Sequence, residues 1–76
     1  MQKQRIEYQS PVDALISVAK RLSRYEERYR MRSEDFFDKF SKGTLEDSED
    51  FIQWSNGYQH YITLKVDIEK QLRHAA

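Results

Sequence analysis

The last third of the chain carries apolar residues at alternating steps of three and four. The series is Phe51, Trp54, Tyr58, Tyr61, Lys65, Ile68 and Leu72, interrupted by one lysine. Such steps place residues on one face of an α-helix. The spacing therefore predicts a long helix over residues 48–73, beginning at Asp47 or Ser48, whose aromatic face requires burial.

A second helix is predicted over residues 11–30. Ser10 can cap its free amides, Pro11 suits the first helical position, and Asp13 follows three residues after the cap. The apolar positions that share a face of this helix are Val12, Leu15, Ala19, Leu22 and Tyr29, widened by Ile16, Val18 and Tyr25.

A short helix over residues 33–42 connects the two. The Ser33 hydroxyl is expected to cap it, and Gly43 is expected to end it in the left-handed conformation. Its apolar contacts come from Phe36, Phe37 and Phe40. Because the connections are short, the two long helices should run antiparallel with the short one over one end. The fold class is therefore all-α, a helical hairpin in a single domain spanning residues 1–76, with a polar arm at 1–9.

The antiparallel arrangement makes specific neighbours. Tyr29 should lie near Phe51, and Glu26 should come level with Trp54. An indole N–H needs an acceptor when it is buried, which predicts a hydrogen bond from Trp54 to Glu26. Gly57, inside the long helix, indicates a close approach by another backbone.

Composition argues against catalysis and cofactors. The 76 residues include no cysteine, so disulfides and thiolate metal sites are excluded. His60 and His74 have no carboxylate or histidine four residues away, as a helical metal pair requires. The two glycines are isolated, so no phosphate loop exists. No apolar run reaches the roughly 20 residues of a membrane span. We expect a cytoplasmic protein that is not an enzyme and carries no cofactor.

Charge is unevenly distributed although the net charge is zero. Residues 1–32 hold eight basic and four acidic side chains, a balance of +4, whereas residues 33–56 hold seven acidic and two basic, a balance of −5. Four arginines at helical spacing form a predicted ridge, namely Arg21, Arg24, Arg28 and Arg32. Such a ridge can contact the phosphates of nucleic acid. A solvated face with local ion pairs is the favoured interpretation, because acidic neighbours dilute the ridge.

Three stretches carry a resemblance: 24–36 (RYEERYRMRSEDF), 40–45 (FSKGTL) and 50–55 (DFIQWS). Together they are similar to a pattern in small bacterial and archaeal proteins, several of which form the lesser member of a gene pair in the style of type II toxin–antitoxin modules. The resemblance covers residues 20–65. It implies an antitoxin-like binder of a cognate toxin, without the DNA-binding module that many antitoxins have.

The residues also favour a binding role. Ile52, Leu64 and Val66 flank the aromatic stripe, so the long helix has more apolar circumference than one neighbour can cover. The surplus predicts a partner protein or a second copy of the chain. The expected contact residues are Trp54, Tyr58, Tyr61, Ile52 and Val66. The alternative for the three aromatic residues is that they form the core of the monomer. An acidic segment of Glu46, Asp47, Glu49 and Asp50 is expected to face a basic partner surface. The alternatives are a homodimeric scaffold or a weak nucleic-acid binder.

Overall fold

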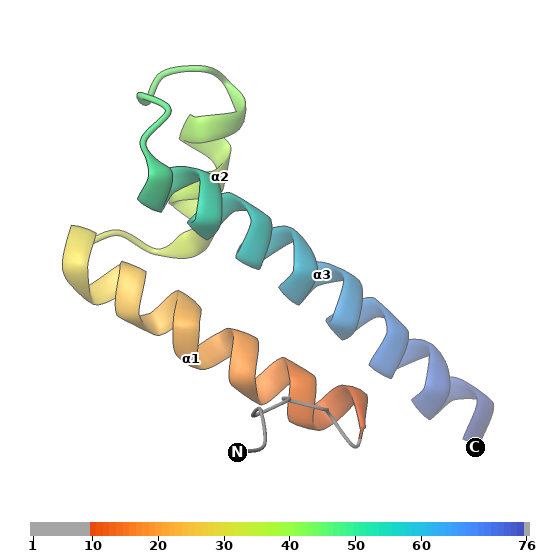
Figure 1. Ribbon diagram of the computed structural model, residues 1–76. Helices are drawn as coiled ribbons and strands as arrows, with labels where there is room; N and C mark the ends of the chain where they lie inside the picture. Colours follow the sequence, from red (N-terminus) through yellow and green to blue (C-terminus); the bar gives the residue numbers. More distant parts are fainter. Residues whose placement is uncertain (1–9, 76) are drawn as a thin grey trace, which may run out of the picture.

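The computed structural model describes residues 10–75, so the arm predicted at 1–9 lies outside the described residues. The described chain forms three helices: α1 (Pro11–Tyr29), α2 (Ser33–Ser41) and α3 (Glu49–Ala75). Helices α1 and α3 run side by side in opposite directions, and α2 lies over one end of the pair (Figure 1). The all-α helical hairpin is therefore confirmed, with helix bounds close to the predicted ones.

The ends of the long helices follow local capping chemistry. The Ser10 hydroxyl accepts a hydrogen bond from the Asp13 amide at 3.2 Å, with Pro11 in the first turn. The Ser48 hydroxyl accepts one from the Phe51 amide at 3.1 Å. These two serines satisfy amides that have no partner within their own helices. Helix α1 ends where Arg30 adopts a left-handed conformation, with φ 53°.

Helix α2 begins differently from the prediction. Its N-cap residue is Arg32, which makes no side-chain capping bond, and the Ser33 hydroxyl does not cap the helix. Instead the Ser33 amide donates to the Glu26 carboxylate at 2.9 Å. A carboxylate from α1 thus lies at the positive end of the α2 dipole, where negative charge is favoured. Past the other end of α2, Gly43 has a positive φ of 77°, as predicted.

The core is an aromatic stack built by all three helices. Trp54 of α3 and Phe36 of α2 are fully buried, with ring centroids 3.9 Å apart and planes within 2° of parallel. Tyr25 and Tyr29 of α1 stack on Trp54 at 5.5 and 5.7 Å. Large aromatic rings that pack in this way contribute more to stability than their buried area alone. Trp54 therefore joins the three helices to one another.

The prediction of a hydrogen bond from Trp54 to Glu26 is wrong. The Trp54 indole Nε1–H donates to the Ser33 hydroxyl at 2.9 Å. The first turn of α2 lies over the indole, and Glu26 is engaged by the amide of that same serine. Ser33 is buried, and it connects the two side chains because its hydroxyl accepts from the indole while its backbone amide donates to the Glu26 carboxylate.

The buried face of α1 is rotated from the predicted one. Ala14, Val18 and Leu22 are buried, whereas Val12, Ile16 and Ala19 are exposed. The large rings of Tyr25 and Tyr29 fix the rotation because both must stack on Trp54. Positions seven residues before them, which share their side of the helix, are then turned toward α3.

Gly57 approaches a side chain of α1 and not a backbone. A Cβ at this position would lie 3.5 Å from Leu22 Cδ2, an ordinary van der Waals distance.

Gly57→Ala should therefore raise the free energy of unfolding by about 0.5–1 kcal/mol, because alanine restricts the unfolded chain and favours helix. Urea unfolding followed by circular dichroism measures this change. Gly43→Ala is the matched control and should destabilise, since its positive φ strains an L-residue. A lower stability for Gly57→Ala would contradict the assigned spacing of α1 and α3.

Candidate binding surfaces

A groove of about 460 Å³ lies between α1 and α3, beside the start of α2. Its apolar lining comes from Ala19 and Leu22 of α1 and from Tyr58, Tyr61 and Ile62 of α3. Charged side chains of both signs complete the lining: Glu26, Arg32, Glu34 and Lys65. An apolar floor with a few polar groups is typical of binding sites.

Exposed apolar residues extend this groove away from α2. Ile16, three residues before Ala19, is 50% exposed, and Val66, four residues after Ile62, is 41% exposed. Residues three or four apart share one side of a helix, so both extend the groove walls. We call this surface the open face: Val12, Ile16, Ala19, Tyr61, Ile62 and Val66. Helix α2 reaches the hairpin at Tyr58, where Phe37 packs with a centroid distance of 5.1 Å.

The residues predicted as partner contacts separate into three groups. Trp54 is fully buried, so its side chain is not at the surface, which favours the core interpretation. Tyr58 and Tyr61 are half-buried in the groove, and burial raises the pKa of the Tyr58 hydroxyl, with smaller contributions from the Glu34 and Tyr61 charges. Val66 belongs to the open face, whereas Ile52 is exposed but does not line the groove.

Sequence reasoning missed the α1 half of the open face. Val12 and Ile16 were assigned to the buried stripe of α1, yet each is 50% exposed. The signal that could have found them is the position of the bulky tyrosines. If Tyr25 and Tyr29 point at the core, residues on the flank of that line face outward.

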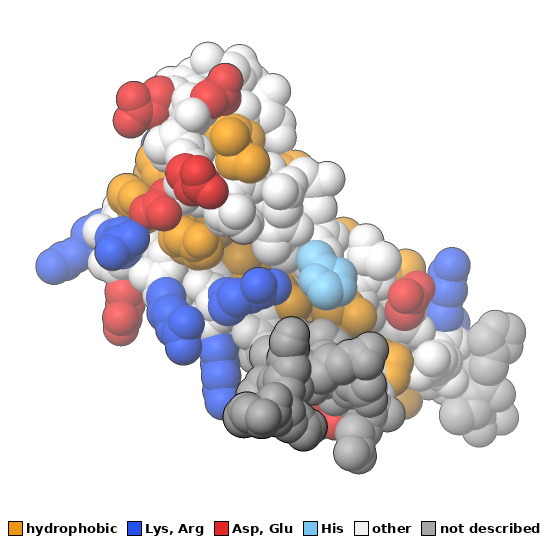
Figure 2. Space-filling model, in the orientation of Figure 1, with side chains coloured by type: hydrophobic (Ala, Val, Ile, Leu, Met, Phe, Trp, Pro, Cys, Tyr) orange, Lys and Arg blue, Asp and Glu red, His pale blue; other side chains and the backbone are white. Residues whose placement is uncertain are grey.

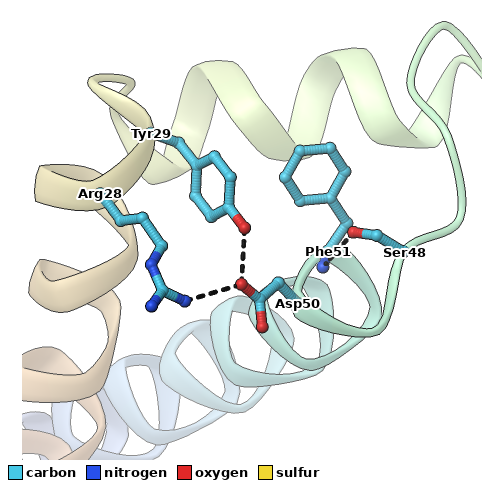
Figure 3. Close-up of polar contacts among 5 residues, drawn as sticks. All are labelled: Arg28, Tyr29, Ser48, Asp50 and Phe51. Carbon is cyan, nitrogen blue, oxygen red and sulfur yellow. Dashed lines mark hydrogen bonds and ion pairs between the residues drawn. The ribbon is translucent and has the colours of Figure 1, made fainter.

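The predicted acidic segment is divided in the structure. Asp50 accepts hydrogen bonds from the Tyr29 hydroxyl at 2.5 Å and from Arg28 Nη1 at 2.9 Å (Figure 3). The Tyr29 hydrogen bond, assisted by the Arg28 charge, lowers the pKa of the Asp50 carboxyl, while desolvation opposes the change. The same carboxylate raises the pKa of the Tyr29 hydroxyl. Asp50 is thus occupied within the chain.

The other three acidic residues of that segment, Glu46, Asp47 and Glu49, are exposed. They lie in the connection between α2 and α3 and at the first residue of α3. They leave an acidic surface at the end of the hairpin that carries α2.

The Asp50 contacts make stability depend on pH in a defined direction. Because folding lowers the pKa of Asp50, its contribution is complete above the ordinary value of 3.8 and is lost as the pH falls through the lower folded value. The Tyr29 contribution is complete below 10.0 and is lost as the pH rises through the higher folded value. Urea unfolding across pH should show a smaller acid-side loss for Asp50→Asn than for the parent. An equal acid-side loss in both proteins would mean that the carboxylate makes no such contacts.

The predicted arginine ridge is retained over three of its four residues. Arg21, Arg24 and Arg28 line one pocket of about 350 Å³, together with Tyr25 and Asp50. Figure 2 shows Lys and Arg side chains gathered along α1, with many of the visible acidic ones toward the end where α2 and α3 meet. This separation matches the charge division along the sequence.

Arg32 does not belong to the ridge. Because α1 ends at Tyr29 and Arg30 turns left-handed, helical spacing does not extend to Arg32. Arg32 instead lines the apolar groove and pairs with Glu34 at 3.6 Å.

Among the side chains of residues 10–73, no group of three or more His, Asp or Glu is arranged to hold a metal ion. None of the three helices combines the length and apolar character needed to cross a bilayer.

No family model, curated protein or solved structure matches the chain.

Proposed function

We propose that the protein is a protein-binding module that receives a helix of a partner on its open face. The observation that carries this proposal is the exposure of apolar side chains from both long helices along one groove. Val12 and Ile16 are 50% exposed, and Ile62 and Val66 are 38% and 41% exposed. Contiguous apolar surface of this kind marks interaction sites.

The lengths of the helices explain why a helix is the expected occupant. Helix α2 has 9 residues, about 14 Å, whereas α1 has 19 residues, about 28 Å. The groove between α1 and α3 therefore continues past the segment that α2 covers. An amphipathic helix laid in a groove between two helices buries anchors at helical spacing. Exposed Lys65 at the groove favours an acidic residue beside the apolar stripe of that helix.

The resemblance of residues 20–65 makes an antitoxin the specific form of this proposal. In that form the bound partner is a cognate toxin, and the protein neutralises it by covering its active surface. Exposed Glu46, Asp47 and Glu49 support the proposal, because they offer negative charge to the basic surface of a nuclease. Asp50 is bound to Tyr29 and Arg28 and is not part of this contact surface.

Substitutions on the open face test the proposal directly. The partner to use is the product of the adjacent gene, co-expressed and co-purified with the protein. The double variant Ile62→Glu and Val66→Glu should weaken the complex by about a hundredfold, because buried charge without a pair costs several kcal/mol. Ile52→Glu is the matched control, since Ile52 is 44% exposed on the same helix but lies about 15 Å along α3 from Ile62, toward the end that carries α2. Isothermal titration calorimetry gives both dissociation constants.

The outcomes separate the proposed function from its alternatives. Growth arrest by the adjacent gene product, relieved on co-expression, supports the antitoxin form. Equal weakening by the Ile52 variant and the double variant would contradict the proposed surface. If the isolated protein has the mass of two chains by light scattering, and the double variant has the mass of one, the open face binds a second copy. That result would replace the toxin by a homodimer.

A further inference from the structure

The pocket lined by Arg21, Arg24 and Arg28 continues into a second pocket on the same face of the hairpin. The two pockets share Arg21 and Tyr25, and the second adds Gln53, Asn56 and His60 of α3. Arg21 and Ala19 are two residues apart on α1, about 200° around the helix, so this surface turns away from the open face. We call it the polar groove: Arg21, Arg24, Tyr25, Gln53, Asn56 and His60.

The three arginines that line the first of these pockets, Arg21, Arg24 and Arg28, have unequal freedom to bind a ligand. Arg28 is paired with Asp50 at 2.9 Å. Arg21 and Arg24 are exposed and form no ion pair with another residue of the described range 10–75. Consecutive arginines of the ridge are separated by about 4.5 and 6 Å along α1. Three regularly spaced cations, two of them unpaired, favour an extended chain of negative groups.

The other groups of the polar groove distinguish one polyanion from another. Side-chain amides and an imidazole lie along the α3 wall, where they can form hydrogen bonds with base edges. Tyr25 lines both pockets, half-buried, and its ring is held in place by the stack on Trp54 at 5.5 Å. A fixed aromatic ring is a platform for an unpaired base. Phosphate-binding cations beside base-binding groups are the chemistry of single-stranded nucleic acid recognition.

We infer that the polar groove binds single-stranded nucleic acid, with Arg21 and Arg24 on phosphates and Tyr25, Gln53, Asn56 and His60 toward the bases. Concave walls formed by two helices accept a strand with separated bases, whereas a duplex would meet only the rim. This site is independent of the open face and of the partner proposed there. Its affinity should lie at about 10⁻⁶–10⁻⁴ M at physiological salt, because few phosphates are neutralised.

Fluorescence anisotropy with labelled oligo(U) and oligo(dT) tests the inference. The double variant Arg21→Gln and Arg24→Gln should weaken binding about tenfold or more, since charge-assisted hydrogen bonds are removed. The matched control is Arg32→Gln with Lys65→Gln, which changes net charge equally but lies on the apolar groove. Thermal unfolding by circular dichroism verifies that both variants are folded. The dependence of log K on log salt should have a slope of about −1.4, corresponding to two phosphate contacts on a single strand.

Three results would overturn the inference. The first is no binding of either oligonucleotide at low salt. The second is an equal loss in the two double variants, which would indicate general charge attraction. The third is equal binding of poly-glutamate or of a DNA duplex, because neither offers unpaired bases. Asn56→Ala gives an independent readout: it should weaken oligonucleotide binding and leave the salt slope unchanged. A preference for oligo(U) or for oligo(dT) would identify RNA or DNA as the ligand.

Discussion

Replacing Trp54 by alanine should remove a large part of the protein's free energy of unfolding. Trp54 is fully buried and stacks on Phe36, Tyr25 and Tyr29, so its loss removes the contact that joins all three helices. Truncating a buried aromatic residue to alanine costs about 3–5 kcal/mol. At about 0.05–0.15 kcal/mol per residue, a chain of 76 residues has about 4–11 kcal/mol of total stability. The substitution therefore removes a large part of the whole.

Urea unfolding monitored by far-ultraviolet circular dichroism measures the effect of Trp54→Ala. Ile52→Ala is the control, because it removes an apolar side chain of the same helix that is 44% exposed. Its cost should be below about 1 kcal/mol. A similar small cost for both variants would show that the aromatic stack does not hold the helices together.

The second large effect is expected at Ser33. Ser33→Ala removes the acceptor of the buried Trp54 indole N–H and should cost about 1–3 kcal/mol, since a buried donor is left without a partner. The bond from the Ser33 amide to Glu26 remains, because it uses the backbone. Ser23→Ala on the exposed side of α1 is the control and should change the free energy of unfolding by less than about 0.5 kcal/mol.

A double-mutant cycle isolates the Ser33–Trp54 bond from the packing of each side chain. Trp54→Phe removes the donor while it keeps an aromatic ring in the stack. The Ser33→Ala change should cost about 1 kcal/mol less in the Trp54→Phe background than in the parent. Strictly additive effects would mean that the indole does not depend on Ser33.

The hairpin could be predicted because its helix ends are encoded locally. Ser10 and Gly43 act within a few residues of themselves, so the sequence identifies them correctly, and of the two predicted starts of the long helix, Asp47 and Ser48, the structure selects Ser48. The same is true of the aromatic spacing that places Trp54 on the inner face of α3. The pairing of Tyr29 with Phe51, whose centroids are 5.1 Å apart, follows from helix direction and connection length alone.

The rotation of α1 and the contacts of Ser33 depend on tertiary packing and could not be derived in this way. Several apolar stripes of α1 have acceptable helical spacing, and only the stack on Trp54 selects among them. Ser33 has the sequence position of a cap, but burial against an indole donor gives its hydroxyl a different partner. Local propensity is overruled where a buried polar group must be satisfied.

The candidate surfaces were predictable on α3 but not on α1, because only the rotation of α1 depends on tertiary packing that its own spacing does not determine. Val66, Tyr58 and Tyr61 lie at or beside the open face because they belong to α3, whose orientation was correctly inferred. The exposure of Val12 and Ile16 was not predicted, because the buried face of α1 in the structure is rotated from the face that its apolar spacing predicts. Arg32 was wrongly grouped with Arg21 and Arg24, since helical spacing was continued past the end of α1 at Tyr29.

The measurement that most directly tests the open face is a nuclear magnetic resonance titration of the labelled protein with the adjacent gene product. Docking of a helix there should shift the methyl signals of Val12, Ile16, Ile62 and Val66 and leave that of Ile52 unchanged. Shifts confined to Ile52, or an absence of shifts at partner concentrations above the dissociation constant, would contradict a docking surface between α1 and α3.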